Sequence, residues 1–432
     1  MPMNAEIGDE SPARDPRTSS ISTVRTLAIE NYRSLRRLVV PLHRVNVITG
    51  PNGSGKSSLY RALRLLADTS RNGAVAALAR EGGLASTLWA GPEAGSATSK
   101  RRGHAGQGTN RRGAPVSLKL GFAGDEFGYA IDLGLPGIAP SSRLAPEIKT
   151  AFLLDPEIKT ESIWHGADLR PSTLLTERSG SIVRIRDDSG TWRRIDRRLR
   201  PYDSMLSELG APEQAPEVTA VREQLQSWRF YDHFRTDTDA PARQGQIGTR
   251  TPVLSADGSD FASALQTVVE SGGGQLLDEA IDRAFPGSRL EILFPGSDPS
   301  IKGRTGVFEI TINQPGLLRR MGSEELSDGT LRYLLLLAAL LSPRPPALFV
   351  LNEPESSLHP ELLEPLASLI HAAAERSQVI VVTHAEVLVR HLETVGESTS
   401  PAQVFELVKD DGETKIIGQR SLDEPSWRWP SR

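Results

Sequence analysis

The spacing of apolar residues predicts strands and then a helix at the start of the folded chain. Three apolar runs fit strands, at 26–32, 36–42 and 44–50. A turn joins the first two, and the third enters a glycine-rich segment. The following residues, 57–67, place Leu59, Leu63 and Leu66 on one helical face. A strand, a glycine turn and a helix therefore follow one another.

The middle of the chain changes to short alternating strands separated by glycine turns, from Val116 to about Arg200. This pattern predicts an antiparallel, β-rich arm. Within it the pentapeptide PEIKT occurs at Pro146 and again at Pro156. That spacing fits related positions in neighbouring strands, but two copies do not define a repeat fold.

The rest of the chain alternates helices with strands. Helices are predicted at 204–228 and, separated by glycines 272–274, within 261–285; strands are predicted at 227–235, 290–294 and 306–312. After residue 325 the pattern is helix, strand, helix, strand, helix and a final hairpin at 403–417. Such alternation at both ends of the chain predicts a mostly parallel, helix-covered sheet. The expected fold class is α/β, with an antiparallel arm and a helical insert.

Composition narrows the class of protein. The 432 residues are 38% hydrophobic and 24% charged, as in ordinary globular proteins. A net charge of -4 argues against a strongly basic nucleic-acid coat but leaves room for a local basic patch. The absence of cysteine excludes disulfides, cysteine-ligated zinc and thiol catalysis. The longest apolar run, 333–341, is about half of a membrane span, and residues 1–23 lack the apolar core of a signal peptide. We therefore expect a soluble cytoplasmic protein with no membrane contact.

Two segments carry clustered basic residues. The segment 91–115 is rich in Gly, Ser and Thr and contains Lys100, Arg101, Arg102, Arg111 and Arg112. Its composition favours a solvated, disordered loop; the alternative is a flexible arm that contacts nucleic-acid phosphates. The second cluster consists of Arg184, Arg186, Arg193, Arg194, Arg197, Arg198 and Arg200. These arginines fit either a DNA contact or a solvated face.

The sequence GPNGSGKS fits the phosphate-loop pattern G-x-x-x-x-G-K-[ST]. Its glycines allow backbone N–H groups to wrap around phosphates, and the positive end of the next helix points at the same anion. Lys56 would bridge the β- and γ-phosphates of ATP, and the Ser57 hydroxyl would ligate Mg²⁺. The predicted nucleotide-binding residues are Gly50, Pro51, Asn52, Gly53, Ser54, Gly55, Lys56, Ser57 and Ser58 in this loop, together with Ser327, Asp328 and Gly329 further along the chain.

Further candidate residues stand between 326 and 353. The apolar strand 348–351 ends at Asn352 and Glu353, and ligands bind at the carboxyl ends of strands in open α/β sheets. Glu353 is therefore placed to polarise a water molecule that attacks the γ-phosphate. In the segment LSDGT, Ser327 would cap a helix whose free N–H groups can receive a γ-phosphate from a second subunit. Asp328, next to Gly329, has to be turned aside or paired, because a carboxylate repels a triphosphate.

Four segments together resemble motifs of ABC-type ATPases of the RecF/SMC-like branch, close to the ATPase half of OLD-family proteins. They are IENYRSL, LSDGTLRYLLLLAALL, LNEPESSLHP and VIVVTHA. SWRFYDHFRTD and TPVLSADG are similar to a stand-alone bacterial subgroup of AAA-family ATPases, and too few residues follow Asp410 for the nuclease domain of full OLD proteins. The resemblance implies a two-lobed P-loop NTPase head that closes as a head-to-tail homodimer around two ATP molecules. It also implies that residues 356–360 cross between subunits and that His384 senses the γ-phosphate.

The chain departs from this family pattern at several positions. Members usually carry an aspartate at the position of Asn352, where it holds Mg²⁺ through water. Asparagine keeps an acceptor oxygen but loses the charge, so Mg²⁺ should depend more on Ser57 and the phosphates, and hydrolysis should be slow. LSDGT stands where the family has LSGGQ. There is no clear glutamine loop: Gln244 and Gln246 are candidates, but a flexible linker is the favoured interpretation. A long heptad segment and a CxxC hook are also absent from the sequence.

The motifs divide the chain into seven expected segments. These are a disordered N-terminus (1–22), a first half of the ATPase head (23–90), a flexible basic loop (91–115), a β-rich arm (116–200), a helical lobe (201–288), a second half of the head (289–420) and a C-terminal tail (421–432).

Three functions remain open from the sequence. The first is an ATP-dependent switch, in which ATP closes the dimer, hydrolysis reopens it, and the closed form engages double-stranded DNA or an effector protein. Relatives with such a switch act in DNA repair, chromosome maintenance or anti-phage defence. The second is a nucleotide-gated scaffold or sensor that hardly hydrolyses ATP, suggested by Asn352. The third, a transporter ATPase, is disfavoured by IENYRSL and by the large middle insert.

Overall fold

The computed structural model describes residues 22–71, 73–91, 116–136, 152, 154–187, 189–210, 215–294, 306–396, 401–420 and 422–432. The predicted N-terminal tail up to residue 21, the predicted basic loop from residue 92 and the first PEIKT copy lie outside these residues.

A large antiparallel sheet forms the arm, with the strand order β2-β1-β4-β5-β6-β7-β8-β9. Its strands are β1 (Val24–Tyr32), β2 (Leu35–Pro41), β4 (Leu118–Gly124), β5 (Phe127–Gly134), β6 (Glu157–His165), β7 (Leu174–Ser179), β8 (Ile182–Arg186) and β9 (Trp192–Arg194). The predicted antiparallel block is thus confirmed, and the structure adds the two N-terminal strands to it. The second PEIKT copy begins β6.

A second sheet, with the order β10-β15-β16-β3-β17-β18, lies at the centre of the molecule. Its strands are β3 (Val45–Thr49), β10 (Arg229–Tyr231), β15 (Leu348–Asn352), β16 (Gln378–Val382), β17 (Gln403–Asp410) and β18 (Glu413–Ile416). All neighbours are parallel except β17 and β18, which form the predicted hairpin. The predicted mostly parallel sheet is confirmed.

Alternate residues of the central strands enter two different cores. In β15, Leu348 and Val350 pack in one core, with α1 (Lys56–Asp68), α5 (Pro216–Ser227) and the antiparallel sheet. Phe349 and Leu351 pack in the other, with α8 (Asp328–Leu340), α9 (Leu363–Ala374) and a helical lobe that contains α6 (Phe261–Val268) and α7 (Gly274–Ala284). This period of two is what a strand that is buried on both faces requires. The central sheet is therefore the middle layer between the arm and the helices.

The helices follow the predicted order. They are α1 (Lys56–Asp68), α2 (Ala74–Arg80), α3 (Leu84–Thr87), α4 (Met205–Glu208), α5 (Pro216–Ser227), α6 (Phe261–Val268), α7 (Gly274–Ala284), α8 (Asp328–Leu340), α9 (Leu363–Ala374) and α10 (Glu386–Gly396). A π-type turn, Val269–Gly273, separates α6 from α7 and contains Gly272 at φ 89°. The break therefore falls at the predicted glycines.

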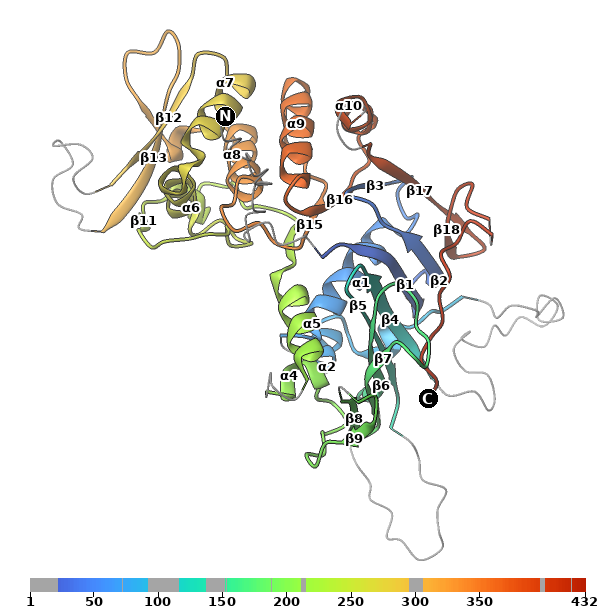
Figure 1. The fold of residues 1–432 in the computed structure, drawn as a ribbon. Helices are drawn as coiled ribbons and strands as arrows, with labels where there is room; N and C mark the ends of the chain where they lie inside the picture. The colour runs from blue at the N-terminus through green and yellow to red at the C-terminus, as the bar shows by residue number, and fades with distance from the viewer. Residues whose placement is uncertain are drawn as a thin grey trace, which may run out of the picture.

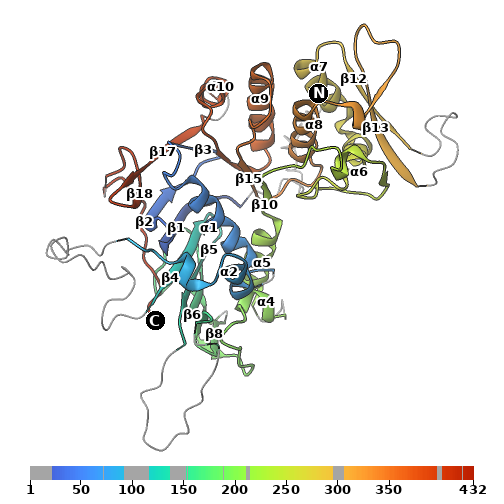
Figure 2. The same ribbon diagram turned by 180° about the vertical axis from the view of Figure 1, so that it is seen from behind.

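The helical lobe projects from one side of the central sheet and the arm from the other (Figures 1 and 2). The lobe also contains a small sheet of β11 (Gln246–Ile247), β12 (Arg289–Leu293), β13 (Val307–Asn313) and β14 (Met321–Gly322). Within the described residues, 3₁₀ helices lie at Pro241–Arg243, Ser323–Glu325 and Pro360–Leu362. Among the described residues, no helix is long and apolar enough to cross a membrane.

Candidate nucleotide-binding site

The candidate site lies where four parallel strands end. The register pairs Tyr231 with Leu351, Asn352 with Val382, and Val382 with Ile48. Consequently the residues that follow β10, β15, β16 and β3 meet at one edge of the central sheet. Ligands of open α/β sheets bind at this carboxyl edge. The fold thus brings together motifs that are far apart in the sequence.

The phosphate loop connects β3 to α1 and has a backbone that favours glycine. Gly50, Gly53 and Gly55 have φ values of 138°, 80° and 113°. A Cβ atom on Gly50 would overlap the carbonyl oxygen of Leu407, and one on Gly55 would overlap the side chain of Thr414. Both obstacles belong to the β17–β18 hairpin. Gly50 and Gly55 are therefore favoured both by their backbone conformation and by the close approach of the hairpin, whereas Gly53 is favoured by its conformation alone.

The hairpin also braces the loop through hydrogen bonds. The Thr414 hydroxyl donates to the Ser54 carbonyl oxygen at 2.8 Å and contacts the Ser34 hydroxyl at 2.8 Å. The Thr414 N–H donates to the Ser34 carbonyl oxygen at 2.8 Å. One C-terminal residue thus ties the phosphate loop to the turn between β1 and β2.

The loop has the donors that a triphosphate needs. The Lys56 ammonium donates to the carbonyl oxygens of Gly50 and Pro51 at 2.6 and 3.1 Å, so it lies inside the curve of the loop. Burial lowers the pKa of Lys56, and the charges of Glu353 and Glu355 oppose this change. No side chain caps α1, which leaves its first N–H groups for an anion. The loop residues fit the phosphates of a nucleotide.

Glu353 and His384, the predicted catalytic residues, lie close together. The Glu353 backbone is left-handed, with φ 48°, and its N–H donates to the Val382 carbonyl oxygen at 2.7 Å. A non-glycine residue in this conformation costs about 1–3 kcal/mol, and such strain concentrates at functional sites. The conformation leaves the Glu353 carboxylate half-exposed, 3.7 Å from Nδ1 of His384.

Glu355 is a residue of the site that sequence reasoning missed. It is only 8% exposed, and its Oε1 accepts from the Thr383 hydroxyl at 2.6 Å and from the His384 N–H at 3.2 Å. Its other oxygen is buried with no hydrogen-bond partner in the described chain. Glu355 therefore fixes the backbone that carries His384. The only sequence signal was an acidic residue two positions after Glu353.

Asn352 makes a contact that the sequence did not predict. Its Nδ2 donates to Oδ1 of Asp232 at 2.6 Å. Both side chains, together with Ser57, line an open hollow of about 930 Å³. The other polar residues that line this hollow are Arg33, Tyr60, Arg61, Arg64, Asp68, Arg71, Arg80 and Glu81.

A magnesium ion in this hollow would need oxygen ligands from phosphates and water in addition to those from the protein. Within the described residues, no group of three or more His, Cys, Asp or Glu side chains could hold a metal ion. Mg²⁺ is usually bound through one or two carboxylates and completes its octahedron with phosphates, water and other oxygen atoms. The Ser57 hydroxyl and the oxygen atoms of Asn352 and Asp232 fit that pattern.

The signature segment begins α8 as the sequence predicted. Ser327 caps the helix by accepting from the Thr330 N–H at 3.1 Å. Asp328 is turned aside: its carboxylate pairs with Arg243 at 2.7 Å. A Cβ on Gly329 would lie 2.6 Å from the carbonyl oxygen of Ser357, so this glycine allows α8 to pack on the 356–360 loop. The pairing removes the repulsion that Asp328 would otherwise impose.

Arg332, one turn further along α8, connects this helix to the residues that follow β10 and β15. It is 2% exposed, and burial lowers its pKa. Its guanidinium donates to the carbonyl oxygens of Glu353 at 3.1 Å and Asp232 at 3.3 Å, and to Nδ1 of His233 at 3.1 Å. The nearby charges of Glu355, Asp232 and Glu353 stabilise the cation. Arg332 was also missed, because its sequence context is an apolar helix.

The predicted glutamine candidates are structural or peripheral. Gln246 is buried in β11, where its Nε2 donates to the carbonyl oxygens of Pro241 and Gly258 and its Oε1 accepts from the Ala262 N–H. The flexible-linker interpretation is therefore wrong for Gln246. A buried amide that satisfies three backbone groups keeps its segment ordered. Gln244 is exposed.

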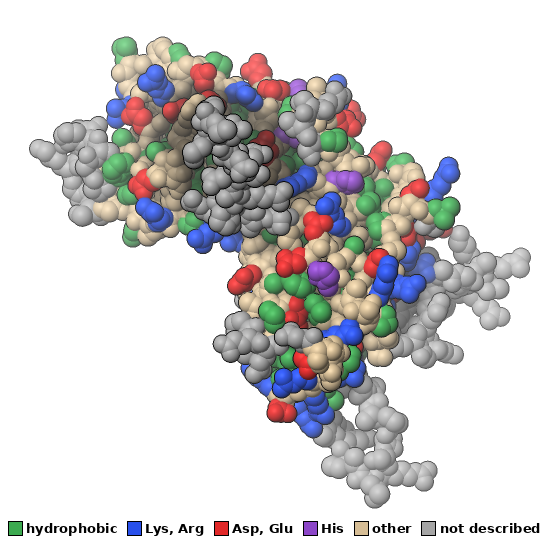
Figure 3. All heavy atoms as spheres, viewed as in Figure 1, with side chains coloured by type: hydrophobic (Ala, Val, Ile, Leu, Met, Phe, Trp, Pro, Cys, Tyr) green, Lys and Arg blue, Asp and Glu red, His purple; other side chains and the backbone are tan. Residues whose placement is uncertain are grey.

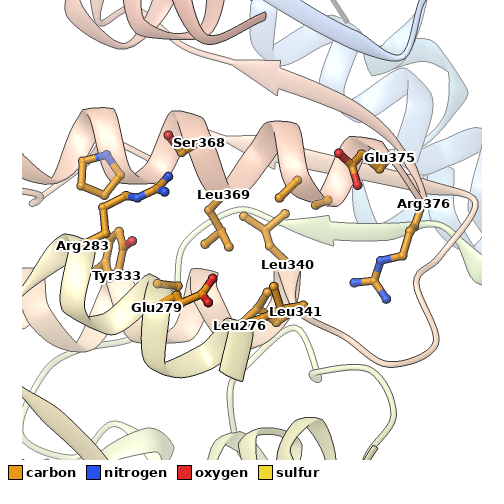
Figure 4. Close-up of a pocket in the computed structure, with 14 residues that line it drawn as sticks. Leu276, Glu279, Arg283, Tyr333, Leu340, Leu341, Ser368, Leu369, Glu375 and Arg376 are labelled. Atoms are coloured by element: carbon orange, nitrogen blue, oxygen red, sulfur yellow. The ribbon is translucent and has the colours of Figure 1, made fainter. Parts of the chain in front are cut away.

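A separate apolar hollow of about 370 Å³ lies between α7, α8 and α9 (Figure 4). Its walls include Leu276 from α7, Tyr333 and Leu340 from α8, and Leu369 from α9. None of its lining residues belongs to the phosphate loop or to the strand ends. It is therefore not part of the candidate nucleotide site.

The central sheet, the glycine loop and the uncapped helix define an α/β P-loop ATPase head with a helical lobe and an antiparallel arm. Residues 45–390 match the family model described as "AAA domain, putative AbiEii toxin, Type IV TA system". This match covers most of the sequence, and the chain belongs to that family of AAA-type, nucleotide-binding ATPases. No curated protein matches the sequence.

Among solved structures, the chain is similar to SMC head domains. One is the SmcHead bound to the C-winged helix domain of ScpA, with 15% identity, a TM-score of 0.46, and coverage of 91% of this chain and 97% of that chain. A second is the Smc head with an extended coiled coil bound to the C-terminal domain of ScpA, derived from Pyrococcus furiosus (13% identity, TM-score 0.44, coverage 92% and 96%). A third is the SMC head from Thermotoga maritima (16% identity, TM-score 0.41, coverage 92% and 99%).

Proposed function

We propose that this chain is an ATP-dependent switch that binds and slowly hydrolyses Mg²⁺-ATP and closes as a head-to-tail homodimer. The observation that carries this proposal is the meeting of the phosphate loop, Glu353 and His384 at one sheet edge. The capped, exposed start of α8 supports the dimer, since its N–H groups can receive an anion from a second subunit.

Each residue has a distinct task in the proposed cycle. Lys56 neutralises charge on the β- and γ-phosphates, and Ser57 supplies a hydroxyl ligand to Mg²⁺. The Glu353 carboxylate orients and polarises the attacking water, while His384 donates a hydrogen bond to the γ-phosphate. Mg²⁺ supplies further neutralisation of phosphate charge when it is bound.

Two substitutions test the nucleotide cycle. Lys56→Ala should abolish ATP binding. Glu353→Gln should bind ATP, lose turnover and accumulate as a dimer in saturating Mg²⁺-ATP, measured by light scattering after size exclusion. Glu361→Gln, an acid whose side chain is 88% exposed, is the matched control and should behave like the unsubstituted protein. A Glu353→Gln protein that keeps its monomer mass would count against the closing dimer.

We further propose that the closed form acts on double-stranded DNA or on an effector protein, as an OLD-related ATPase in DNA maintenance or defence. The arm is the candidate DNA surface, since basic side chains gather at its far end, over β8 and β9 (Figure 3). Three of its arginines are neutralised by ion pairs: Arg184 with Glu177, Arg197 with Glu208, and Arg200 with Asp203. Exposed arginines with no ion pair among the described residues are Arg193, Arg194 and Arg198.

Titrating double-stranded DNA into an ATP turnover assay at modest salt tests the DNA branch of the proposal. Stimulation that disappears as salt rises would support DNA contact, because phosphate binding releases counterions. Replacing Arg193, Arg194 and Arg198 by Gln should remove the stimulation. Replacing the three ion-paired arginines should reduce it less. Turnover that stays flat would favour a protein effector.

A nucleotide-gated sensor that hardly hydrolyses ATP is the second candidate, favoured by the asparagine at position 352. It predicts tight Mg²⁺-ATP binding and dimer closure with negligible single-turnover hydrolysis. An Asn352→Asp variant that hydrolyses ATP no faster than the unsubstituted protein would weaken this hypothesis.

A further inference from the structure

Asp232 stands beside Asn352 at the ends of two neighbouring parallel strands. The register of β10 with β15 pairs Tyr231 with Leu351, so the next residues on the two strands are Asp232 and Asn352. Their side chains meet at 2.6 Å, with the amide donating to the carboxylate. Asp232 is exposed to the same hollow as Ser57, the first residue after Lys56 in the phosphate loop.

The Asp232–Asn352 pair carries a single negative charge, because two carboxylates at this spacing would repel each other. Carboxylates at both positions would lie within hydrogen-bond distance of each other, and such a pair tends to take up a proton. An amide at position 352 instead donates to Asp232 and fixes the orientation of its carboxylate. The acidic charge expected on β15 is thus present, but one strand away on β10.

We propose that Asp232 is the carboxylate of the magnesium site in this chain, with Ser57 as the hydroxyl ligand and Asn352 as the positioning partner. The inference rests on the proposed function, since the ion would arrive with ATP. Two observations support it independently of sequence motifs: the shared hollow and the 2.6 Å contact. Arg332 also fixes the position of Asp232, because its guanidinium donates a hydrogen bond to the Asp232 carbonyl oxygen at 3.3 Å.

Binding of Mn²⁺, as a paramagnetic substitute for Mg²⁺, tests the assignment without relying on turnover. The protein is saturated with a non-hydrolysable ATP analogue, and free Mn²⁺ is measured by electron paramagnetic resonance. Asp232→Asn should weaken Mn²⁺ binding by about tenfold or more. Binding of a fluorescent ATP analogue in EDTA should stay unchanged, which also shows that the variant is folded. Asp239→Asn, an exposed acid on the same loop, is the matched control and should bind Mn²⁺ normally.

A double substitution that exchanges the residues at positions 232 and 352, called the exchange variant, tests the assignment more stringently. Asp232→Asn combined with Asn352→Asp moves the carboxylate back to β15 and should recover most of the Mn²⁺ affinity. Unchanged Mn²⁺ affinity in Asp232→Asn, or an exchange variant that binds no better than Asp232→Asn, would overturn the assignment. Failure of the proposed function gives a different result, because the unsubstituted protein would then bind no nucleotide even in EDTA.

Discussion

Replacing Arg332 by Met should separate ATP binding from ATP turnover. The substitution keeps an unbranched apolar stem in α8 but removes the guanidinium. The carbonyl oxygens of Glu353 and Asp232 would then lose the donor that holds them at 3.1 and 3.3 Å. Because neither group belongs to the phosphate loop, we expect the affinity for ATP to be retained.

The magnitude follows from the contacts and from the burial of Arg332. A hydrogen bond from a charged donor contributes about 1.5–3 kcal/mol, and the long distances here favour the lower end of that range. Removing the cation also removes its desolvation cost, so a net loss of about 2–3 kcal/mol in the free energy of unfolding is expected. A shift of the Glu353 backbone by about 1 Å would reduce turnover by roughly 100-fold.

The assay compares single-turnover hydrolysis with binding of a fluorescent ATP analogue. Arg332→Lys keeps the charge but lacks the second terminal nitrogen, which contacts Nδ1 of His233, so its turnover should fall between those of Arg332→Met and the unsubstituted protein. Arg344→Met, an exposed site beyond the end of α8, is the matched control. Turnover by Arg332→Met within about twofold of the unsubstituted rate would refute the role we assign to this arginine, since a 100-fold loss is expected.

Two further pairs of substitutions test the packing. Gly55→Ala should abolish nucleotide binding, because its Cβ would overlap the Thr414 side chain. Gly53→Ala has no atom within 4 Å of the new Cβ and should cost only the strain of φ 80°, about 1–2 kcal/mol of stability. Isothermal titration with ATP compares the two variants. Arg178→Met should lower the unfolding free energy of the arm by about 3–5 kcal/mol, because it leaves the fully buried Glu161 carboxylate without its cation. Arg197→Met, at an exposed pair, should cost about 0–1 kcal/mol, and equal urea midpoints for these two variants would contradict the argument.

Local pattern was sufficient to predict most strands and helices, the glycine loop and the place of Glu353 at the end of a strand, while His384 was suggested by the family resemblance. Those features depend on short-range spacing and on the rule that parallel strands end at one edge. Asp232, by contrast, matters only because β10 pairs with β15, which lies about 120 residues later. The bracing of the loop by Thr414 depends on an even longer separation. The roles of such residues are set by strand order, which periodicity does not encode.

The wrong interpretation of Gln246 has a similar physical origin. Its neighbours in APARQGQIG are small or polar, a composition typical of linkers. The structure shows that its amide satisfies three backbone groups in a compact turn. Side-chain hydrogen bonds of this kind order a segment that has little apolar content.

The position of β3 between β16 and β17 also sets the order of events during synthesis. Both neighbours lie more than 300 residues after β3 in the chain. At about 5–20 residues per second, roughly 20–70 s pass between the emergence of the phosphate loop and that of the hairpin that braces it. Throughout this interval the nascent chain has an open strand edge and an incomplete loop. The ability to bind ATP is therefore acquired only near the end of translation, and a ribosome that stalls before residue 403 leaves a polypeptide without a finished nucleotide site.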